Sequence, residues 1–267
     1  MKQYLMRIFL LNLICVVYSE NFTTKGQIQD LNNLYYDINL TSDIKFSEGT
    51  VIIKDYDKGE KENSYIISSK KVKLCNDSSI PFIQFDDAER YLILANQDIL
   101  LVYDGNNITP KFLATNFGGQ SEFIEYINPV TVKVSSELKE GSKIYAGENI
   151  ANLNITEPWV ENAEDNGINE EISFLGNCTV LYILNGYVSF DKPYLYEANS
   201  RLKKNEVSFP DELNKTSIIV ELNDTPNPQK IDLGFRCQSQ IKIKILDVYE
   251  GKKYKDTCLS GIIMRVY

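Results

Sequence analysis

The stretch Gln240–Ile245, QIKIKI, alternates strictly between polar and isoleucine side chains. Successive side chains of a β-strand point to opposite faces, so an extended backbone puts the three isoleucines on one face. The pattern therefore predicts a half-buried strand whose isoleucines face a hydrophobic core.

The same β-rich pattern continues along the chain, and turn residues separate the runs. Examples are GTVIIKDYD (49–57), NSYIISSKKVKL (63–74) and RYLILANQDILLVYDGNN (90–107), the last with turns at Asn96–Asp98 and Asp104–Gly105. Residues 137–153 predict one short helical turn. We therefore expect an all-β fold built of sandwiches or barrels, with a small N-terminal β domain over residues 20–128, a meander or barrel, and a second β domain over residues 129–267.

The first residues have the pattern of a secretory signal peptide. Lys2 and Arg7 precede an apolar run that is too short to span a membrane, and Val17–Ser19 fits the small-x-small cleavage pattern. We expect cleavage after Ser19 and export to the periplasm, the cell surface or the medium. A lipid anchor on Cys15 is a weaker alternative, because a bulky Ile14 precedes it. No other stretch predicts a membrane span.

Charge and compartment narrow the classes of partner. Removing residues 1–19 leaves 26 basic and 37 acidic residues, a net charge of 26 − 37 = −11. Such a chain is not expected to bind nucleic acid or an anionic lipid surface.

The remaining cysteines are Cys75, Cys178, Cys237 and Cys258. They allow three disulfide pairings, and the sequence cannot choose among them. We expect either buried free thiols or one structural disulfide. Eight N-x-S/T triplets occur in an Asn- and Ile-rich chain, and we interpret them as unused sequons of a bacterial protein.

Catalytic patterns are scarce. The chain contains no histidine, so it cannot build a Ser-His-Asp or Cys-His site, and a zinc hydrolase is disfavoured. A glycosidase with two carboxylates stays open, although no spacing pairs two of them. The segment EDNGINEE (164–171) offers oxygen ligands for a structural calcium ion, but its spacing differs from that of an EF-hand. No cofactor is otherwise expected.

Tyrosine, asparagine and arginine gather in the second half of the chain. A strand is expected to end at Asn185-Gly186, and Tyr187 follows this turn dipeptide directly. Tyr194 and Tyr196 are expected to share one face of a strand. Aromatic rings and amide or guanidinium groups are suited to sugar binding, while the alternative is that these residues are half-buried parts of the sandwich.

Four blocks in this half resemble one known family, the discoidin-like module called the NADase-type glycan-binding domain, which is named for the translocation domain of a bacterial NAD glycohydrolase. The blocks are SSELKEGSKIYAGENIAN (135–152), EPWVENAEDNGINEEISF (157–174), LYILNGYVSFDKPYLYEANSRLKKNEV (181–207) and ILDVYEGKKYKDTCLSGIIM (245–264). The resemblance covers about residues 129–267. It implies a jelly-roll sandwich that binds carbohydrate or another surface ligand through loops at one end, without catalysis.

The resemblance also implies candidate ligand-binding residues. They are Trp159, Glu161, Asn185, Tyr187, Asn199, Arg201, Asp256 and Thr257.

Two of these residues carry sharper expectations. Trp159 is expected to anchor the strand that precedes an acidic loop. Glu161 is expected either to contact ligand or to pair with Arg201. Where the family has several glycines in this loop, only Gly167 remains, and asparagine is expected to adopt the left-handed backbone in their place.

Three functions follow from these features. The first is an exported, non-catalytic protein that binds a glycan or another cell-envelope component. The second is a structural or adhesion protein that acts through contacts with other proteins. The third is a glycosidase that the sandwich targets to its substrate. Fold analogy alone does not choose among them.

Overall fold

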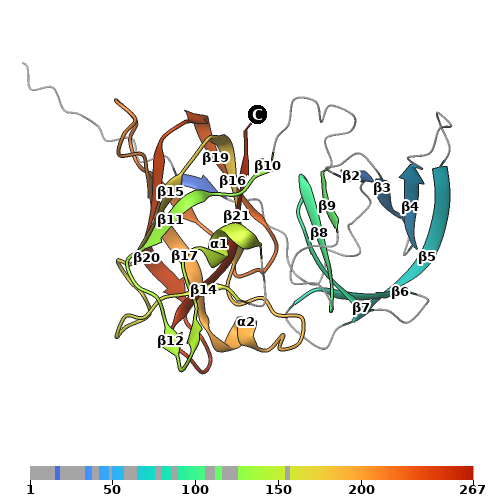
Figure 1. The fold of residues 1–267 in the computed structure, drawn as a ribbon, viewed down its shortest axis with the longest axis horizontal. Helices are drawn as coiled ribbons and strands as arrows, with labels where there is room; N and C mark the ends of the chain where they lie inside the picture. Colours follow the sequence, from blue (N-terminus) through green and yellow to red (C-terminus); the bar gives the residue numbers. More distant parts are fainter. Residues whose placement is uncertain are drawn as a thin grey trace, which may run out of the picture.

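The all-β fold class is confirmed in the structure, which is a computed structural model. It describes residues 80–85, 90–105, 126–153 and 157–266, together with the strands outside these ranges. Figure 1 shows two bodies side by side, a small barrel formed by the N-terminal part and a larger sandwich formed by the C-terminal part. No helix among the described residues is long and apolar enough to cross a membrane.

The barrel closes because each strand pairs antiparallel with the next and the last strand returns to the first. Its predicted hairpin is confirmed: the Oδ1 atom of Asn96 accepts hydrogen bonds from the N–H groups of Asp98 and Ile99, each at 2.8 Å. The strands are β2 (Leu34–Asp37), β3 (Ser42–Ser47), β4 (Thr50–Tyr56), β5 (Tyr65–Cys75), β6 (Phe82–Phe85), β7 (Arg90–Ala95), β8 (Ile99–Asp104) and β9 (Phe112–Thr115).

The sandwich contains the remaining elements. Its strands are β10 (Tyr126–Ile127), β11 (Val130–Val134), β12 (Lys139–Glu140), β13 (Lys143–Ile144), β14 (Trp159–Val160), β15 (Glu171–Leu175), β16 (Cys178–Asn185), β17 (Ser200–Ser208), β18 (Ile218–Glu221), β19 (Gln229–Cys237), β20 (Gln240–Tyr249) and β21 (Thr257–Arg265). Two single-turn helices join them, α1 (Asn149–Asn152) and α2 (Leu195–Ala198), and α1 confirms the predicted helical turn. Strand β1 (Val16–Tyr18), which lies within the predicted signal peptide, pairs in parallel with β18.

Two layers make the sandwich. One layer follows the order β11-β15-β20-β17-β18, and the other contains β21, β16 and β19 with the short β10 and β14 beside β21. A short parallel ladder between β17 and β21 connects the layers, with Ser200 opposite Thr257 and Arg201 opposite Cys258. The QIKIKI prediction is confirmed, because Ile241, Ile243 and Ile245 are at most 2% exposed and belong to the core between the layers.

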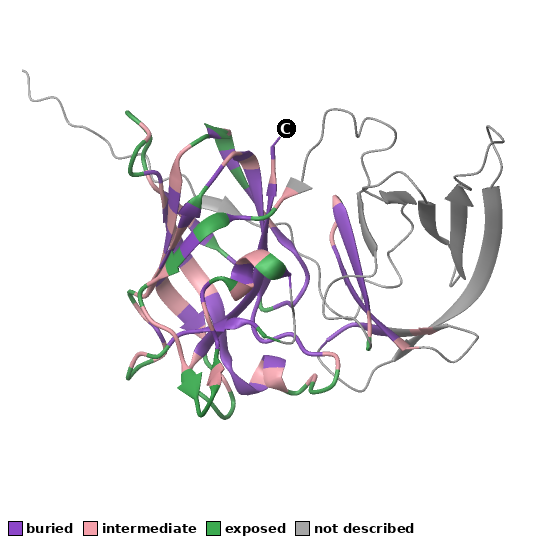
Figure 2. Cartoon of the chain, in the orientation of Figure 1, coloured by how far each residue is buried: buried purple, intermediate pink, exposed green. Residues whose placement is uncertain are grey.

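Strands β16 and β21 are buried on both faces, as Figure 2 shows by their nearly unbroken purple colour. Along β16, Leu181 and Ile183 face the sandwich core, while Tyr182 and Leu184 belong to a second cluster with side chains of β7 and β8. Because alternate side chains of a strand point to opposite faces, β16 contributes to both hydrophobic clusters. The barrel is packed on the outer face of the β16–β21 layer, and this packing explains the continuous apolar runs.

Polar contacts fix the barrel on this face. The Oδ2 atom of Asp98 accepts a hydrogen bond from the Tyr182 hydroxyl at 2.7 Å and lies 3.0 Å from Nζ of Lys230 and 3.6 Å from a guanidinium nitrogen of Arg265. The Ala95 N–H donates to the Asn227 side chain at 3.0 Å. The turn between β7 and β8 is therefore held by charge as well as by apolar contact.

Candidate functional site

The start of β21 brings the sequence-predicted site residues together. Leu259 is the Cα partner of both Trp159 in β14 and Asn185 at the end of β16, and Thr257 and Cys258 pair with the start of β17. Seven of the eight predicted residues are buried: Trp159, Glu161, Asn185, Tyr187, Asn199, Arg201 and Thr257. Asp256 is half-buried. Their predicted contact with ligand stays a prediction, but their positions show that they hold the loops in place.

Trp159 is an anchor, as the sequence predicted. Its side chain is 0% exposed and lies in the sandwich core, and its Nε1–H donates to the carbonyl of Ser136 at 2.9 Å. The ring is therefore unavailable as an exposed platform for a ligand.

Glu161 holds the acidic loop against β21. Its carboxylate accepts the N–H of Ala163 at 2.5 Å and the N–H of Thr257 at 3.0 Å, and the Thr257 hydroxyl donates to the Asn166 carbonyl at 2.7 Å. Gly167 has φ +76°, and a Cβ there would lie 2.8 Å from the Glu161 side chain, so only glycine fits this turn. Asn169 has φ 72°, so asparagine adopts the left-handed backbone at one place in this loop, whereas Asn162 and Asn166 do not.

The acidity of Glu161 yields a pH-dependent prediction. Burial raises its pKa above the ordinary value, and the two N–H donors offset only part of this effect. Since the folded pKa is the higher one, the stability that Glu161 contributes is complete below its unfolded pKa and is lost as pH rises through the folded pKa. We expect the free energy of unfolding of the wild type, minus that of Glu161→Gln, to fall as pH is raised through the range that starts at the ordinary glutamate pKa of about 4.3. Urea denaturation across this range measures the difference, and a difference that rises with pH would contradict the assignment.

Asn185 joins β16 to β17 at the level of the site. Its Nδ2 donates to the Leu202 carbonyl at 2.7 Å, and its Oδ1 accepts the Leu202 N–H at 2.9 Å. The predicted turn at Gly186 is confirmed by φ +80°, where a Cβ would lie 2.7 Å from the side chains of both Arg201 and Tyr196. The amide and the glycine together let β17 approach β16 closely.

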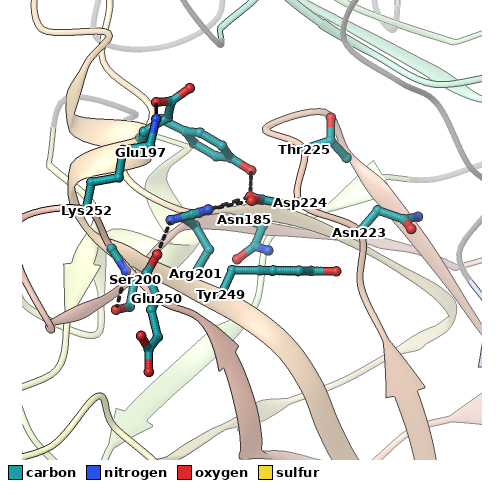
Figure 3. Close-up of polar contacts among 12 residues, drawn as sticks. Asn185, Glu197, Ser200, Arg201, Asn223, Asp224, Thr225, Tyr249, Glu250 and Lys252 are labelled. Atoms are coloured by element: carbon teal, nitrogen blue, oxygen red, sulfur yellow. Dashed lines mark hydrogen bonds and ion pairs between the residues drawn. The ribbon is translucent and has the colours of Figure 1, made fainter.

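Arg201 forms its ion pair with Asp224, so the predicted pair with Glu161 is wrong. The Nε of Arg201 donates to Oδ1 of Asp224 at 3.0 Å and a terminal nitrogen donates to Oδ2 at 2.5 Å, as Figure 3 shows. The guanidinium also donates to the carbonyls of Asn199 at 2.9 Å and Glu250 at 3.2 Å. Glu161 instead accepts hydrogen bonds from the backbone N–H groups of Ala163 and Thr257.

Aromatic rings surround the Arg201 head group. The guanidinium carbon lies 5.3 Å from the ring centroid of Tyr196 and 6.0 Å from that of Tyr249, and the Tyr196 hydroxyl donates to Asp224 at 3.1 Å. Burial would lower the pKa of Arg201, but its hydrogen bonds and charge interaction with Asp224 outweigh burial and raise it. Burial and Asp224 both raise the pKa of Tyr196. The cluster therefore pairs the Arg201 guanidinium with the Asp224 carboxylate, whose side chain is 40% exposed.

The predicted shared face of Tyr194 and Tyr196 is wrong. The segment forms α2 rather than a strand, and side chains two apart on a helix point in different directions. Tyr196 is 2% exposed under Arg201, whereas Tyr194 is 60% exposed. The turn-forming Pro193 was the signal against a strand at this position.

Exposed side chains lie beside this buried cluster, in the loop between β20 and β21. The N–H groups of Lys253 and Tyr254 donate to the Ala198 carbonyl at 3.0 and 2.8 Å, so this loop is fastened to the end of α2. Tyr254 is 38% exposed, and Nζ of Lys253 lies 4.7 Å from its ring centroid. The hydrogen bond with Tyr254 raises the pKa of Lys253, and Tyr194 adds to the rise. Two exposed rings and one cation thus share a surface, which we call the Tyr194–Tyr254 surface.

Asp224, Tyr249 and Tyr254 were missed as site residues. Both tyrosines stand in the last of the four resembling blocks, so the motif held a signal for them. Asp224 lies in the turn-rich segment NDTPNP (223–228), and nothing local in that segment indicates a partner 23 residues away. No cluster of three or more His, Cys, Asp or Glu side chains suited to a metal ion occurs among the residues that the structure describes.

The two-layered sandwich, with its loops gathered at the start of β21, is that of F5/8 type C domains, the discoidin-like class. The chain belongs to the NAD glycohydrolase translocation F5/8 type C domain family, whose model matches residues 125–265. The matched domain is a translocation domain, not a catalytic one, and the expected resemblance is confirmed.

Other comparisons add little. No curated protein matches the chain significantly. Ten chains among the solved structures match. One is a mutant of the arabinofuranosyltransferase AftD from Mycobacteria, determined by single-particle cryo-electron microscopy, with 11% sequence identity and a TM-score of 0.35. The match covers 52% of this chain and 11% of that chain.

Proposed function

We propose that this chain is an exported, non-catalytic bacterial protein whose sandwich binds carbohydrate on a cell envelope or cell surface. The observation that carries the proposal is the Tyr194–Tyr254 surface. Two exposed tyrosine rings flank Lys253 on loops that hydrogen bonds hold in place. An aromatic ring can cover the C–H face of a pyranose, while hydroxyl and ammonium groups bond its hydroxyls.

The buried cluster supports binding indirectly. Arg201 donates a hydrogen bond to the Glu250 carbonyl at one end of the exposed loop. Further along the loop, two backbone N–H groups donate to the carbonyl of Ala198 at the end of α2. A loop that is ordered before ligand arrives loses less conformational entropy on binding. The motif residues thus act on binding by positioning the exposed tyrosines.

A glycan array probed with the full chain tests the proposal. We expect binding to at least one class of glycan, and the double substitution Tyr194→Ala with Tyr254→Ala should weaken it by about tenfold or more. The matched control is Leu213→Ala, since Leu213 is 90% exposed in the loop after β17, at the other end of that strand from Arg201. Tyr194→Phe should retain most of the affinity because it keeps the ring.

Two results would decide against the proposal. One is a folded protein that binds no glycan and no envelope extract. The other is binding that survives the double alanine substitution unchanged, which would place the ligand elsewhere on the sandwich.

A further inference from the structure

Two cysteines, both free thiols in the structure, lie on paired strands at the far end of the sandwich from the Tyr194–Tyr254 surface. Cys178 begins β16 and Cys237 ends β19, and their Cα atoms are direct partners across the two antiparallel strands. Both side chains are 0% exposed and belong to the sandwich core. Directly opposed residues of antiparallel strands have Cα atoms about 4.5–5.5 Å apart, within the range that a disulfide spans.

The third described cysteine cannot compete for either of them. The Cys258 carbonyl accepts the Gly186 N–H, so Cys258 lies at the opposite end of β16 from Cys178. Seven residues of extended strand separate the two ends by about 23 Å. Cys258 packs instead in a separate cluster with Tyr145 and Tyr187. Among the three pairings that the sequence left open, this excludes any bridge from Cys258 to Cys178 or Cys237.

The surroundings of the pair favour a covalent bridge over a metal ion. Within the described part of the chain, no group of three metal-ligating side chains includes them. Burial raises the pKa of Cys178 to about 12, with Cys237 adding to the rise, and burial also raises the pKa of Cys237. A buried thiol of high pKa forms little thiolate and reacts slowly. Oxidation therefore belongs to the folding reaction, before the two strands close over the sulfurs.

We propose that Cys178 and Cys237 form a disulfide when the chain folds in the presence of a thiol–disulfide oxidant. Each thiol loses one proton and one electron, a bond forms between the two Sγ atoms, and the disulfide bond of the oxidant breaks to give two thiols. The bridge closes the loop of chain between β16 and β19 at the edge of one layer. Cys258, a free thiol in the structure, has no part in this bridge.

Refolding of the full chain tests this bridge. The unfolded, reduced protein is refolded with either a mixture of oxidised and reduced glutathione or dithiothreitol, and remaining thiols are then alkylated in denaturant. After refolding with glutathione we expect peptide mapping to show one linked pair of peptides containing Cys178 and Cys237, with Cys258 alkylated. The bridged protein should unfold at a temperature about 5–15 °C higher than the reduced protein.

Matched variants separate the bridge from other thiols. The double variant Cys178→Ala with Cys237→Ala should lose the linked peptides and show the same unfolding temperature with either redox agent. Cys258→Ala should keep both the linked peptides and the temperature difference. Alkylation of both Cys178 and Cys237 after refolding with glutathione, or a bridge from either to another cysteine, would overturn the proposal. These outcomes do not depend on glycan binding or on export.

Discussion

The sandwich separated from the barrel, as residues 125–267, is expected to fail as a stable monomer. Its outer face carries Val180, Tyr182 and Leu184 of β16 and Ile263 of β21, all at most 1% exposed in the full chain and packed against the barrel. Exposing an apolar side chain of this size costs about 1.5–3 kcal/mol, so the four together cost about 6–12 kcal/mol. This is comparable to the whole stability of an ordinary domain.

The measurement is size-exclusion chromatography with light scattering, alongside thermal unfolding, on the sandwich and on the full chain. We expect the sandwich to aggregate or to unfold far below the full chain. A matched variant carries Val180→Thr, Leu184→Thr and Ile263→Thr, which keep strand-forming residues on that face but make it polar. This variant should recover a larger monomeric fraction. A wild-type sandwich that stays monomeric with the unfolding temperature of the full chain would contradict the role of the barrel.

Replacing Asn205 by valine is expected to stabilise the protein by about 1–3 kcal/mol. Asn205 lies in β17, 2% exposed, and neither Oδ1 nor Nδ2 of its amide has a hydrogen-bond partner. Its Cα partners are Val220 and Ile245, two residues of the sandwich core. An unsatisfied buried amide destabilises the fold, and valine fills the site with a side chain suited to a strand. Chemical denaturation followed by circular dichroism measures the change.

Asn185→Val provides the matched control, because Asn185 is equally buried but fully engaged with Leu202. This change leaves a buried N–H and a buried carbonyl without partners, so we expect a loss of about 2–4 kcal/mol. The same substitution at two buried asparagines should thus change stability in opposite directions. Destabilisation by Asn205→Val of the same size as by Asn185→Val would show that the Asn205 amide is satisfied.

Local patterns predicted the fold where one side of a strand decides burial. QIKIKI (240–245) alternates because one face of β20 meets the core and the other does not. The run LYILN (181–185) carries no such alternation, because β16 meets the core on one face and the barrel on the other. An apolar run of that kind is compatible with several environments, so it could not predict that the barrel packs against β16.

The resemblance named the candidate residues but not the role of each one. The motif residues converge on the start of β21 as the resemblance implied, but seven of the eight are buried. Arg201 illustrates the reason. A motif indicates that an arginine stands at this position, but it does not indicate whether the guanidinium pairs with Asp224 or with a ligand. Tyr194, Leu195 and Tyr196 alternate as in a strand, but Pro193 directly precedes them and the segment forms the helical turn α2.

The sequence by itself determined the all-β class, the hairpin turns, the family of the second half and the anchor role of Trp159. These depend on side-chain periodicity, turn chemistry and local motifs, which are properties of short segments. Tertiary structure alone decided that Arg201 pairs with Asp224, that Cys178 lies opposite Cys237, and that β16 is covered on both faces. These depend on which strands become neighbours, and strand order is set by burial summed over the whole molecule rather than by any one segment.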